Sequence, residues 1–356
     1  MSNPKLKGLI LAAGHGTRLR PITSLRPKPT IPVANKQLIH YAVDNLVEAG
    51  VEEIGIVVSY DTIDYLKKSL DNYGKARFEY IIQDPPLGLA HAVAVSREFL
   101  GDSPFVMYLG DNLFQQGIKQ FVDAFRPEEG VNSVLALVRV EDPRQFGVAI
   151  VENNRVVNLV EKPKDPPSDL AIAGVYVFDS SIHDAIEGLQ PGAKDEYQIT
   201  DAIQRLIERD YNVAPVVVGG WWKDTGNPED ILDANRLQLD RATRDIKGEV
   251  IDSEIEGAVV VEPGAVIRRS TIRGPAHIGE GTVIEDSTIG AYTTVGDQCT
   301  VKKCDIEYSV IGAGTVLEKL SKPLRSSLIG EEVVLRGNGN EHYSLVVGDK
   351  SQLSLE

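Results

Sequence analysis

The 356-residue sequence predicts an α/β fold with a mostly parallel sheet, followed by a parallel β-helix. Over the first 240 residues or so, strand-like apolar runs alternate with helix-like segments. After that point the helical period disappears and a short repeat of aliphatic residues replaces it. The chain is also too long for one typical core, which favours two domains. We expect them at 1–245 and 246–356.

Four apolar runs in the first domain indicate buried strands: GLILAA (8–13), EIGIVVS (53–59), FEYIIQ (78–83) and FVMYLG (105–110). A helical segment lies between the first two, and its apolar face is formed by Leu38, Tyr41, Ala42 and Leu46. Alternating strands and helices imply βαβ units and a Rossmann-like, mostly parallel sheet. Ligands of such sheets bind beyond the carboxyl ends of the strands.

The second domain shows a repeat of aliphatic residues. They recur six residues apart in triplets, and each triplet follows the previous one after 17 residues: Ile255, Val261 and Ile267; Ile272, Ile278 and Ile284; Ile289, Val295 and Val301. A six-residue strand-and-turn unit repeated three times per coil is typical of a parallel β-helix. Ile311 and Ile329 continue the series after an interruption. The pattern resembles the left-handed β-helices of sugar-nucleotide enzymes and acyltransferases.

Composition and charge narrow the class of protein. A hydrophobic content of 42% and a charged content of 25% are ordinary for a globular protein. The net charge of −15 argues against non-specific binding to nucleic acid, which depends on a basic surface. No apolar run could span a bilayer, and the N-terminus lacks the apolar core of a secretory signal. We therefore expect a cytoplasmic protein with neither nucleic-acid nor membrane partners.

A glycine-rich turn with basic residues, LAAGHGTRLRPITSLRPKP (11–29), follows the first apolar run. It is not a Walker A loop, because no Gly-Lys-Ser/Thr follows, and Leu19 stands where a dinucleotide fingerprint needs its third glycine. Gly14 and Gly16 let backbone N–H groups approach an anion. Arg18 adds a forked donor for phosphate oxygens. These residues indicate a phosphate cradle, with an exposed charged loop as the alternative.

This stretch resembles the signature of the sugar-1-phosphate nucleotidylyltransferases, G-x-G-T-R-L-x-P-x-T followed by P-K-P. Other landmarks of the family follow in order, including QDPPLGLAHAV (83–93), YLGDN (108–112), LVEKP (159–163) and WWKDTGNPEDILDAN (221–235). The resemblance spans essentially the whole chain and implies a domain of the nucleotide-diphospho-sugar transferase type. It further implies Mg²⁺-dependent in-line displacement at the α-phosphate of dTTP by glucose 1-phosphate, which gives dTDP-glucose and pyrophosphate.

The resemblance also implies roles for individual residues. Asp111 and Asp224 match the aspartates that bind Mg²⁺, an ion that prefers hard carboxylate oxygens. The catalytic cations are Arg18 at the α-phosphate, Lys28 at the departing pyrophosphate and Lys162 at the sugar phosphate. The nucleotide-binding positions are Leu11, Gly14, Gly16, Thr17, Gln83 and Gly88, and the sugar-binding positions are Gly147, Glu161 and Tyr176.

Several alternatives stay open. Where relatives commonly carry Arg-Gly-Glu-Leu-Glu before Ile-Thr-Asp, this chain has KDEYQITD (194–201), so Lys194 retains the charge without the guanidinium fork. Transfer from UTP or another nucleotide, to glucose or N-acetylglucosamine 1-phosphate, is the nearest alternative. Acyl transfer in the β-helix would have to use His277 or His342, and a non-catalytic regulatory subunit is disfavoured by the retained charged residues. We also expect a homo-oligomer, because the ends of β-coils expose strand edges.

Overall fold

The computed structural model describes residues 5–192, 195–337 and 345–355. They gather into two compact units. The first, termed the α/β unit, consists of Met1–Gly14 and Leu38–Asp224, and the second, termed the β-helix unit, consists of His15–Gln37 and Thr225–Glu356. The glycine-rich stretch is therefore divided after Gly14. The division of the chain into domains at residue 245 stays a prediction.

The α/β unit is built on a nine-stranded sheet with the order β10-β9-β11-β6-β1-β4-β5, in which β8 pairs with β11 and β12. Its strands are β1 (Lys7–Leu11), β4 (Glu53–Val58), β5 (Arg77–Ile82), β6 (Phe105–Leu109), β8 (Val131–Arg139), β9 (Gly147–Glu152), β10 (Arg155–Glu161), β11 (Leu170–Phe178) and β12 (Asn212–Val217). β5, β4, β1 and β6 run parallel, so the predicted α/β class and its four strands are confirmed. The expectation that all four are buried is wrong for β5, which lies at the edge of the sheet and has only half-buried or exposed residues. β11 runs antiparallel to β6, β8 and β9.

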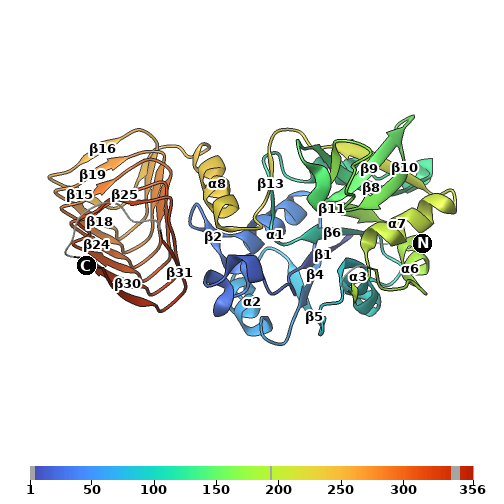
Figure 1. Cartoon of the computed structure of the whole chain (residues 1–356), viewed down its shortest axis with the longest axis horizontal. Helices are drawn as coiled ribbons and strands as arrows, with labels where there is room; N and C mark the ends of the chain where they lie inside the picture. The colour runs from blue at the N-terminus through green and yellow to red at the C-terminus, as the bar shows by residue number, and fades with distance from the viewer. Residues whose placement is uncertain (1–4, 193–194, 338–344, 356) are drawn as a thin grey trace. The chain divides into compact units, whose positions relative to one another are not determined.

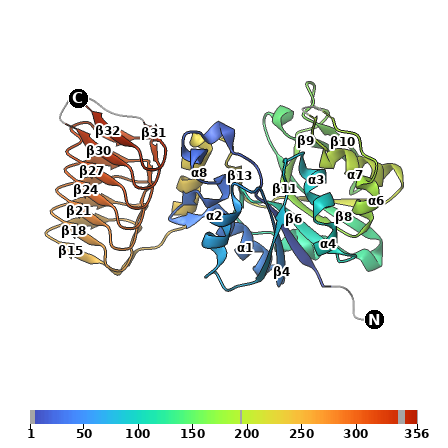
Figure 2. The same ribbon diagram turned by 90° about the horizontal axis from the view of Figure 1, so that it is seen from below.

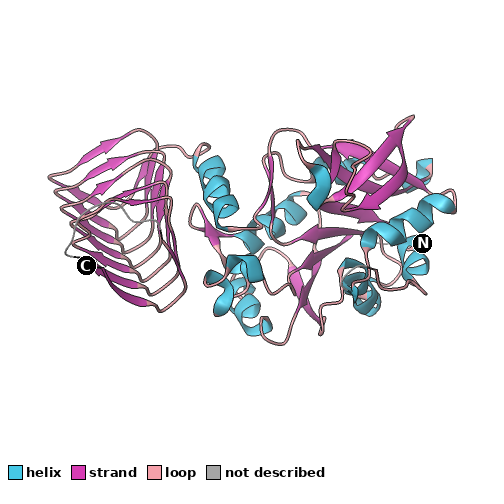
Figure 3. Cartoon of the chain, viewed as in Figure 1, coloured by secondary structure: helices cyan, strands magenta, loops and turns pink. Residues whose placement is uncertain are grey.

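Helices cover both faces of this sheet (Figures 1 and 3). They are α1 (Leu38–Glu48), α2 (Ile63–Leu70), α3 (Leu89–Val95), α4 (Arg97–Leu100), α5 (Lys119–Ala124), α6 (Ser181–Ile186) and α7 (Ile199–Glu208), with short 3₁₀ turns η4 (Pro127–Glu129) and η5 (Pro143–Gln145). Because neighbouring strand residues point to opposite faces, Leu9 packs in one core with Ile203 of α7, and Ile10 packs in the other with Leu46 of α1.

The β-helix unit stacks short parallel strands into three sheets (Figure 2). The first sheet contains β14 (Asp245–Ile246), β17 (Val259–Val261), β20 (Ala276–Ile278), β23 (Thr293–Val295), β26 (Val310–Ile311), β29 (Leu328–Ile329) and β31 (Val346–Val347). The second contains β15 (Glu249–Ile251), β18 (Val266–Arg268), β21 (Val283–Glu285), β24 (Thr300–Lys302), β27 (Val316–Glu318), β30 (Val334–Gly337) and β32 (Gln352–Leu355). The third contains β16 (Glu254–Glu256), β19 (Thr271–Arg273), β22 (Thr288–Ile289), β25 (Asp305–Glu307) and β28 (Leu324–Arg325).

The register of these strands follows the aliphatic repeat. Ile255 pairs with Ile272, and Ile272 with Ile289, in the third sheet. Val295 pairs with Ile311 in the first sheet, so the series continues beyond the ninth aliphatic position. The triplet residues form one hydrophobic core along the stack. The predicted parallel β-helix is therefore confirmed.

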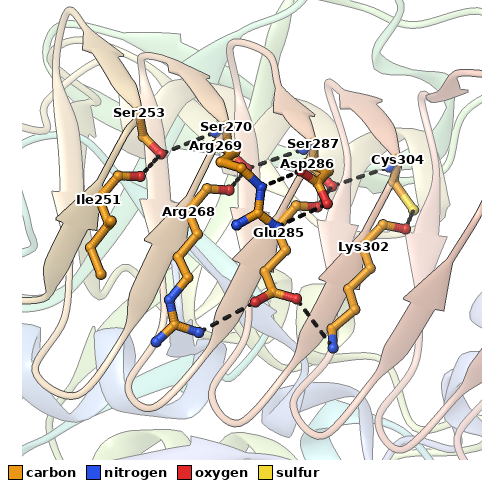
Figure 4. Close-up of polar contacts among 10 residues, drawn as sticks. All are labelled: Ile251, Ser253, Arg268, Arg269, Ser270, Glu285, Asp286, Ser287, Lys302 and Cys304. Carbon is orange, nitrogen blue, oxygen red and sulfur yellow. Dashed lines mark hydrogen bonds and ion pairs between the residues drawn. The ribbon is translucent and has the colours of Figure 1, made fainter.

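Side-chain hydroxyls form a ladder along one corner of the β-helix (Figure 4). The hydroxyls of Ser253, Ser270 and Ser287 donate to carbonyl oxygens two residues earlier, each over 2.7 Å. Each hydroxyl also accepts the backbone N–H one coil further, and the last of these N–H groups belongs to Cys304, 3.1 Å from Ser287 Oγ. Cys299 and Cys304 are buried free thiols, and burial raises their pKa values to about 12 and about 11.

The β-helix unit also contains residues 15–37 and one longer helix. The segment holds three 3₁₀ turns and a hairpin: η1 (Thr17–Leu19), η2 (Ile22–Ser24), η3 (Lys28–Thr30), β2 (Pro32–Val33) and β3 (Lys36–Gln37). The helix is α8 (Pro228–Leu239), whose N-cap Asn227 forms a reciprocal capping box with Asp230. No helix in the described part of the chain has the length and hydropathy needed to cross a membrane.

Candidate active site

The two predicted metal ligands lie at the ends of strands of the α/β unit. Asp111 follows β6, whose end is tied to β1 by the Gly110 N–H, which donates to Leu11 O over 3.1 Å. The next strand, β7 (Asn112–Phe114), pairs antiparallel with β13 (Trp222–Asp224), and Asp224 stands opposite Asn112. The two aspartates are therefore one residue apart in register. Because Asn227 caps α8, Asp224 does not serve as its N-cap.

Asn112 holds the side chain of Asp111, although sequence reasoning assigned it no role. Its Nδ2 donates to Asp111 Oδ1 over 2.8 Å, and its Oδ1 accepts the Trp222 Nε1–H over 2.7 Å. Asn112 is buried, with 3% of its surface exposed, so its amide has no solvent to replace these partners. Gly174 of β11 lies against it, since a Cβ there would be 2.7 Å from Asn112 Oδ1. In the sequence, the position of this amide directly after the predicted ligand Asp111 was the signal that could have identified it.

A second cluster lies at the ends of β9 and β10. Gly147 and Glu161 face each other in register, and a Cβ on Gly147 would lie 3.2 Å from Glu161 Oε2. Glu161 pairs with the Lys162 ammonium over 3.0 Å and accepts the Thr200 hydroxyl over 3.2 Å. Lys162 has a positive φ of 43° and is anchored by its N–H, which donates to Phe146 O.

The pKa values of Tyr176 and Asp201 reflect the burial and the negative charge of this cluster. Burial, followed by the charge of Glu161, raises the pKa of Tyr176, so its phenol stays protonated as a potential donor. The same two causes raise the pKa of the Asp201 carboxyl. The structure thus brings together Gly147, Glu161, Lys162 and Tyr176, and their roles in binding the sugar phosphate stay a prediction. Thr200 was missed, although it lies within the ITD landmark of the family.

Gln83 and Gly88 lie together between β5 and α3. Gln83 Nε2 donates to Gly88 O over 2.9 Å, and it lies 3.1 Å from Nδ1 of His91. Burial lowers the pKa of His91, which favours the neutral ring that can accept this hydrogen bond. Gly88 has a φ of 98°, and a Cβ there would be 2.6 Å from Tyr197 O, so only glycine suits this turn. Sequence reasoning gave His91 no role in the site.

The remaining predicted residues border or occupy the glycine-rich stretch. In the α/β unit, Leu11 ends β1 and Gly14 is exposed. In the β-helix unit, Gly16 has a left-handed φ of 57°, and its carbonyl accepts the Thr23 hydroxyl over 2.8 Å. Thr17 and Arg18 are exposed on η1, whereas Lys28 is buried on η3.

Lys194 and the two histidines considered for acyl transfer, His277 and His342, were also singled out in the sequence. Lys194 and His342 lie outside the described residues. His277 lies on β20, and its Nε2 is 3.1 Å from Glu262 Oε1. Acyl transfer in the β-helix stays an untested alternative.

Comparisons with known proteins define the class. Residues 7–241 match the family model described as Nucleotidyl transferase, and the chain belongs to this family. Glucose-1-phosphate thymidylyltransferase of Streptomyces griseus is 39% identical over 356 residues, covering 98% of this chain and 99% of that protein. Low-salt glycan biosynthesis nucleotidyltransferase Agl11 of Haloferax volcanii is 42% identical over 361 residues, covering 98% and 100%.

A solved structure extends the comparison to the fold. UDP-glucose pyrophosphorylase complexed with UDP-glucose aligns with a TM-score of 0.60 and 28% identity, covering 67% of this chain and all of that chain. Together these similarities confirm the predicted class of enzyme, a sugar-1-phosphate nucleotidyltransferase.

Proposed function

We propose that the protein transfers a thymidylyl group from dTTP to glucose 1-phosphate, releasing pyrophosphate and forming dTDP-glucose. The observation that carries the proposal is the register of β7 and β13, which brings Asp111 beside Asp224 in the same unit as the Glu161–Lys162 cluster. The similarity to the Streptomyces griseus protein over nearly the full length supports the choice of base and sugar.

Asp111 and Asp224 fit a Mg²⁺ ion. They offer hard carboxylate oxygens from adjacent register positions, and Asn112 fixes the orientation of the first. Triphosphate oxygens and water would supply its remaining ligands. When bound, Mg²⁺ supplies neutralisation of the charge on the phosphate oxygens.

The chain's own residues then position the reactants. The second pKa of a phosphate monoester is about 6, so the attacking oxygen is already anionic at neutral pH and needs no general base. Lys162 would bind the sugar phosphate, and Glu161 and the Thr200 hydroxyl oxygen would accept hydrogen bonds from sugar hydroxyls. Arg18 would stabilise charge at the α-phosphate, and Lys28 would hold the pyrophosphate.

The base would be read by Gln83. Its Nε2 hydrogens point to Gly88 O and to His91, which leaves Oε1 as the acceptor for a ligand. Thymine and uracil carry a hydrogen on N3 that this oxygen can accept, whereas cytosine does not. The arrangement therefore favours dTTP and UTP over CTP. Thymine and uracil differ by one methyl group, which a hydrophobic pocket distinguishes by about 1–3 kcal/mol.

UTP-dependent synthesis of UDP-glucose is the second candidate. The fold similarity to the UDP-glucose complex favours it. The experiment is pyrophosphate release with Mg²⁺, glucose 1-phosphate and each nucleoside triphosphate in turn, with Asp111→Asn as the inactive control. We expect the highest kcat/KM with dTTP. A product formed only with N-acetylglucosamine 1-phosphate would overturn the sugar assignment.

A further inference from the structure

Residues 15–37 carry Arg18 and Lys28 and have little regular structure of their own. Their 3₁₀ turns are three residues long, and β2 and β3 have two residues each. Such short elements give the segment few backbone hydrogen bonds with which to hold a shape. Its conformation must therefore depend on what it contacts. In the β-helix unit it is attached at three places: to α8 and β23 together, to the turn after β29, and to the turn after β31.

The first attachment is a buried amide that joins three elements. The Ala34 N–H, at the tip of the β2–β3 hairpin, donates to Asn235 Oδ1 of α8 over 2.9 Å. The Thr294 hydroxyl of β23 donates to the same oxygen over 2.8 Å, and Asn235 Nδ2 donates to Tyr292 O over 3.1 Å. Asn235 and Thr294 are both fully buried, so water cannot replace these bonds.

A neighbouring bond strengthens this attachment. Asn35 Nδ2 donates to Val295 O over 2.9 Å. Ala34 and Asn35 have φ values of 48° and 57°, so both central residues of the turn are left-handed. A two-residue turn of this kind has a defined shape. The tip of the hairpin is thus held to one coil of the β-helix at two points.

The second attachment is a buried arginine. Only 6% of the Arg26 side chain is exposed, and its Nη1 pairs with Glu331 Oε1 over 2.6 Å. Its Nη2 and Nε also donate to Thr30 O and Oγ1, over 2.6 and 3.2 Å. Arg26 therefore braces the turn that contains Lys28 against the β-helix. The Glu331 N–H donates in turn to Asp349 Oδ1, one coil further, over 2.9 Å.

The third attachment is a close approach of backbones. A Cβ on Gly348 would lie 2.7 Å from Pro21 O, so the turn after β31 touches the segment at the residue before η2. Within the segment, Thr23 of η2 is bonded to Gly16, and a Cβ on Gly16 would lie 3.2 Å from Lys28 Cβ. The turns that carry Arg18 and Lys28 are thus packed together and held from one side.

We infer that the β-helix positions Arg18 and Lys28, with Asn235, Arg26 and Glu331 as the positioning residues. The inference rests on the proposed function, which gives the two cations their task at the triphosphate. The β-helix is accordingly part of the machinery of nucleotidyl transfer, and its contacts with residues 21–35 set the activity of the enzyme.

The test uses the full chain with two variants and a matched control. Glu331→Gln removes the charge that faces Arg26, and Asn235→Ala removes the amide shared by the hairpin and β23. Glu318→Gln is the control, because Glu318 pairs with Arg336 over 3.0 Å on a nearby coil and is no part of the three attachments. Each variant is measured by pyrophosphate release and by hydrogen exchange of peptides that cover residues 15–37.

The expected result is selective. In both variants kcat falls about 10- to 100-fold, as a displacement of about 1 Å in a reacting group can cause. The KM for glucose 1-phosphate changes less than twofold, because the Glu161–Lys162 cluster belongs to the α/β unit. Exchange of residues 15–37 rises at least about tenfold, whereas peptides of the α/β unit exchange as in the wild type. The control matches the wild type in all three measurements.

Three results would overturn the inference. Unchanged exchange in residues 15–37 would show that these contacts do not hold the segment. Faster exchange with an unchanged kcat would show that the segment's attachment does not matter for turnover. An equal rise of exchange in both units would indicate general destabilisation instead of positioning. Inactivity of the wild type with every nucleoside triphosphate would instead refute the proposed function, and the exchange data would still decide whether the attachment exists.

Discussion

Replacement of Gly174 by alanine tests how Asp111 is held. Gly174 has a φ of 73°, and its added methyl group would lie 2.7 Å from Asn112 Oδ1 and 2.9 Å from Asn112 Cγ. A left-handed alanine costs about 1–2 kcal/mol, and overpacking a buried site costs about 1–3 kcal/mol more. We therefore expect Gly174→Ala to lower the free energy of unfolding by about 2–5 kcal/mol.

The same change should weaken the proposed Mg²⁺ site. Asn112 must move away from the new methyl group, and its bond to Asp111 Oδ1 is then lost or lengthened. Partners that orient metal ligands are worth about 10–100-fold in metal affinity or activity. The Mg²⁺ concentration for half-maximal pyrophosphate release should rise by about that factor.

Gly130→Ala provides the matched control. Gly130 has a φ of 82°, but an added Cβ would have no atom within 4 Å outside the two adjacent residues. This variant should therefore lose only the backbone contribution of about 1–2 kcal/mol and keep the wild-type Mg²⁺ dependence. Urea unfolding and Mg²⁺ titrations measure both effects. Equal losses of stability in the two variants, with unchanged Mg²⁺ dependence, would refute the positioning role of Asn112.

Three further outcomes are expected. Burial, then the charge of Arg97, lowers the pKa of His183 to about 4 from its ordinary 6.5. The unfolded chain therefore binds this proton first as the pH falls from 6.5 toward 4, and the free energy of unfolding decreases over that range. Urea titrations of His183→Phe should show a shallower decrease. His91→Phe removes an acceptor from Gln83 Nε2, so the KM for dTTP should rise about tenfold in steady-state kinetics, with the KM for glucose 1-phosphate unchanged. Lys162→Met should lower kcat by about 10²–10³ in pyrophosphate-release assays.

Each of these expectations has a contrary result. An identical pH dependence in the wild type and His183→Phe would mean that other groups dominate between pH 4 and 6.5. A uniform rise in both KM values for His91→Phe would point to misfolding of the α3 region. A wild-type kcat for Lys162→Met would remove this lysine from the catalytic set.

Periodic features of the sequence were predictable, because packing imposes them locally. The aliphatic triplets from Ile255 to Val301 identified the β-helix, since every coil must place an aliphatic side chain at the same register position in one core. The parallel half of the α/β sheet was likewise visible in four apolar runs. The antiparallel strand β11 was not foreseen, because a buried strand has the same apolar pattern in either direction.

Long-range polar contacts were not predictable from local patterns. The landmarks of the family pointed to Asp111, Asp224, Glu161 and Lys162, but not to the residues that orient them. Asn112 owes its role to Trp222, which lies 110 positions away. The grouping of residues 15–37 with the β-helix depends on contacts such as Asn35 with Val295, which are 260 residues apart in the sequence. The periodic patterns of apolar residues in the sequence do not indicate such a contact.

The hydroxyl ladder of the β-helix runs in one direction along the chain. Each serine accepts an N–H from the coil that follows it, as when the Ser270 N–H donates to Ser253 Oγ. Within this ladder, loss of a C-terminal coil leaves an oxygen without one donor, whereas loss of an N-terminal coil leaves a buried N–H without its acceptor, which costs about 1–3 kcal/mol. In the ladder, each coil therefore supplies the acceptor that the following coil needs, whereas backbone bonds such as that from the Thr271 N–H to Ser287 O run the opposite way. A nascent chain emerging N-terminus first finds each acceptor of the ladder already in place when the matching donor arrives.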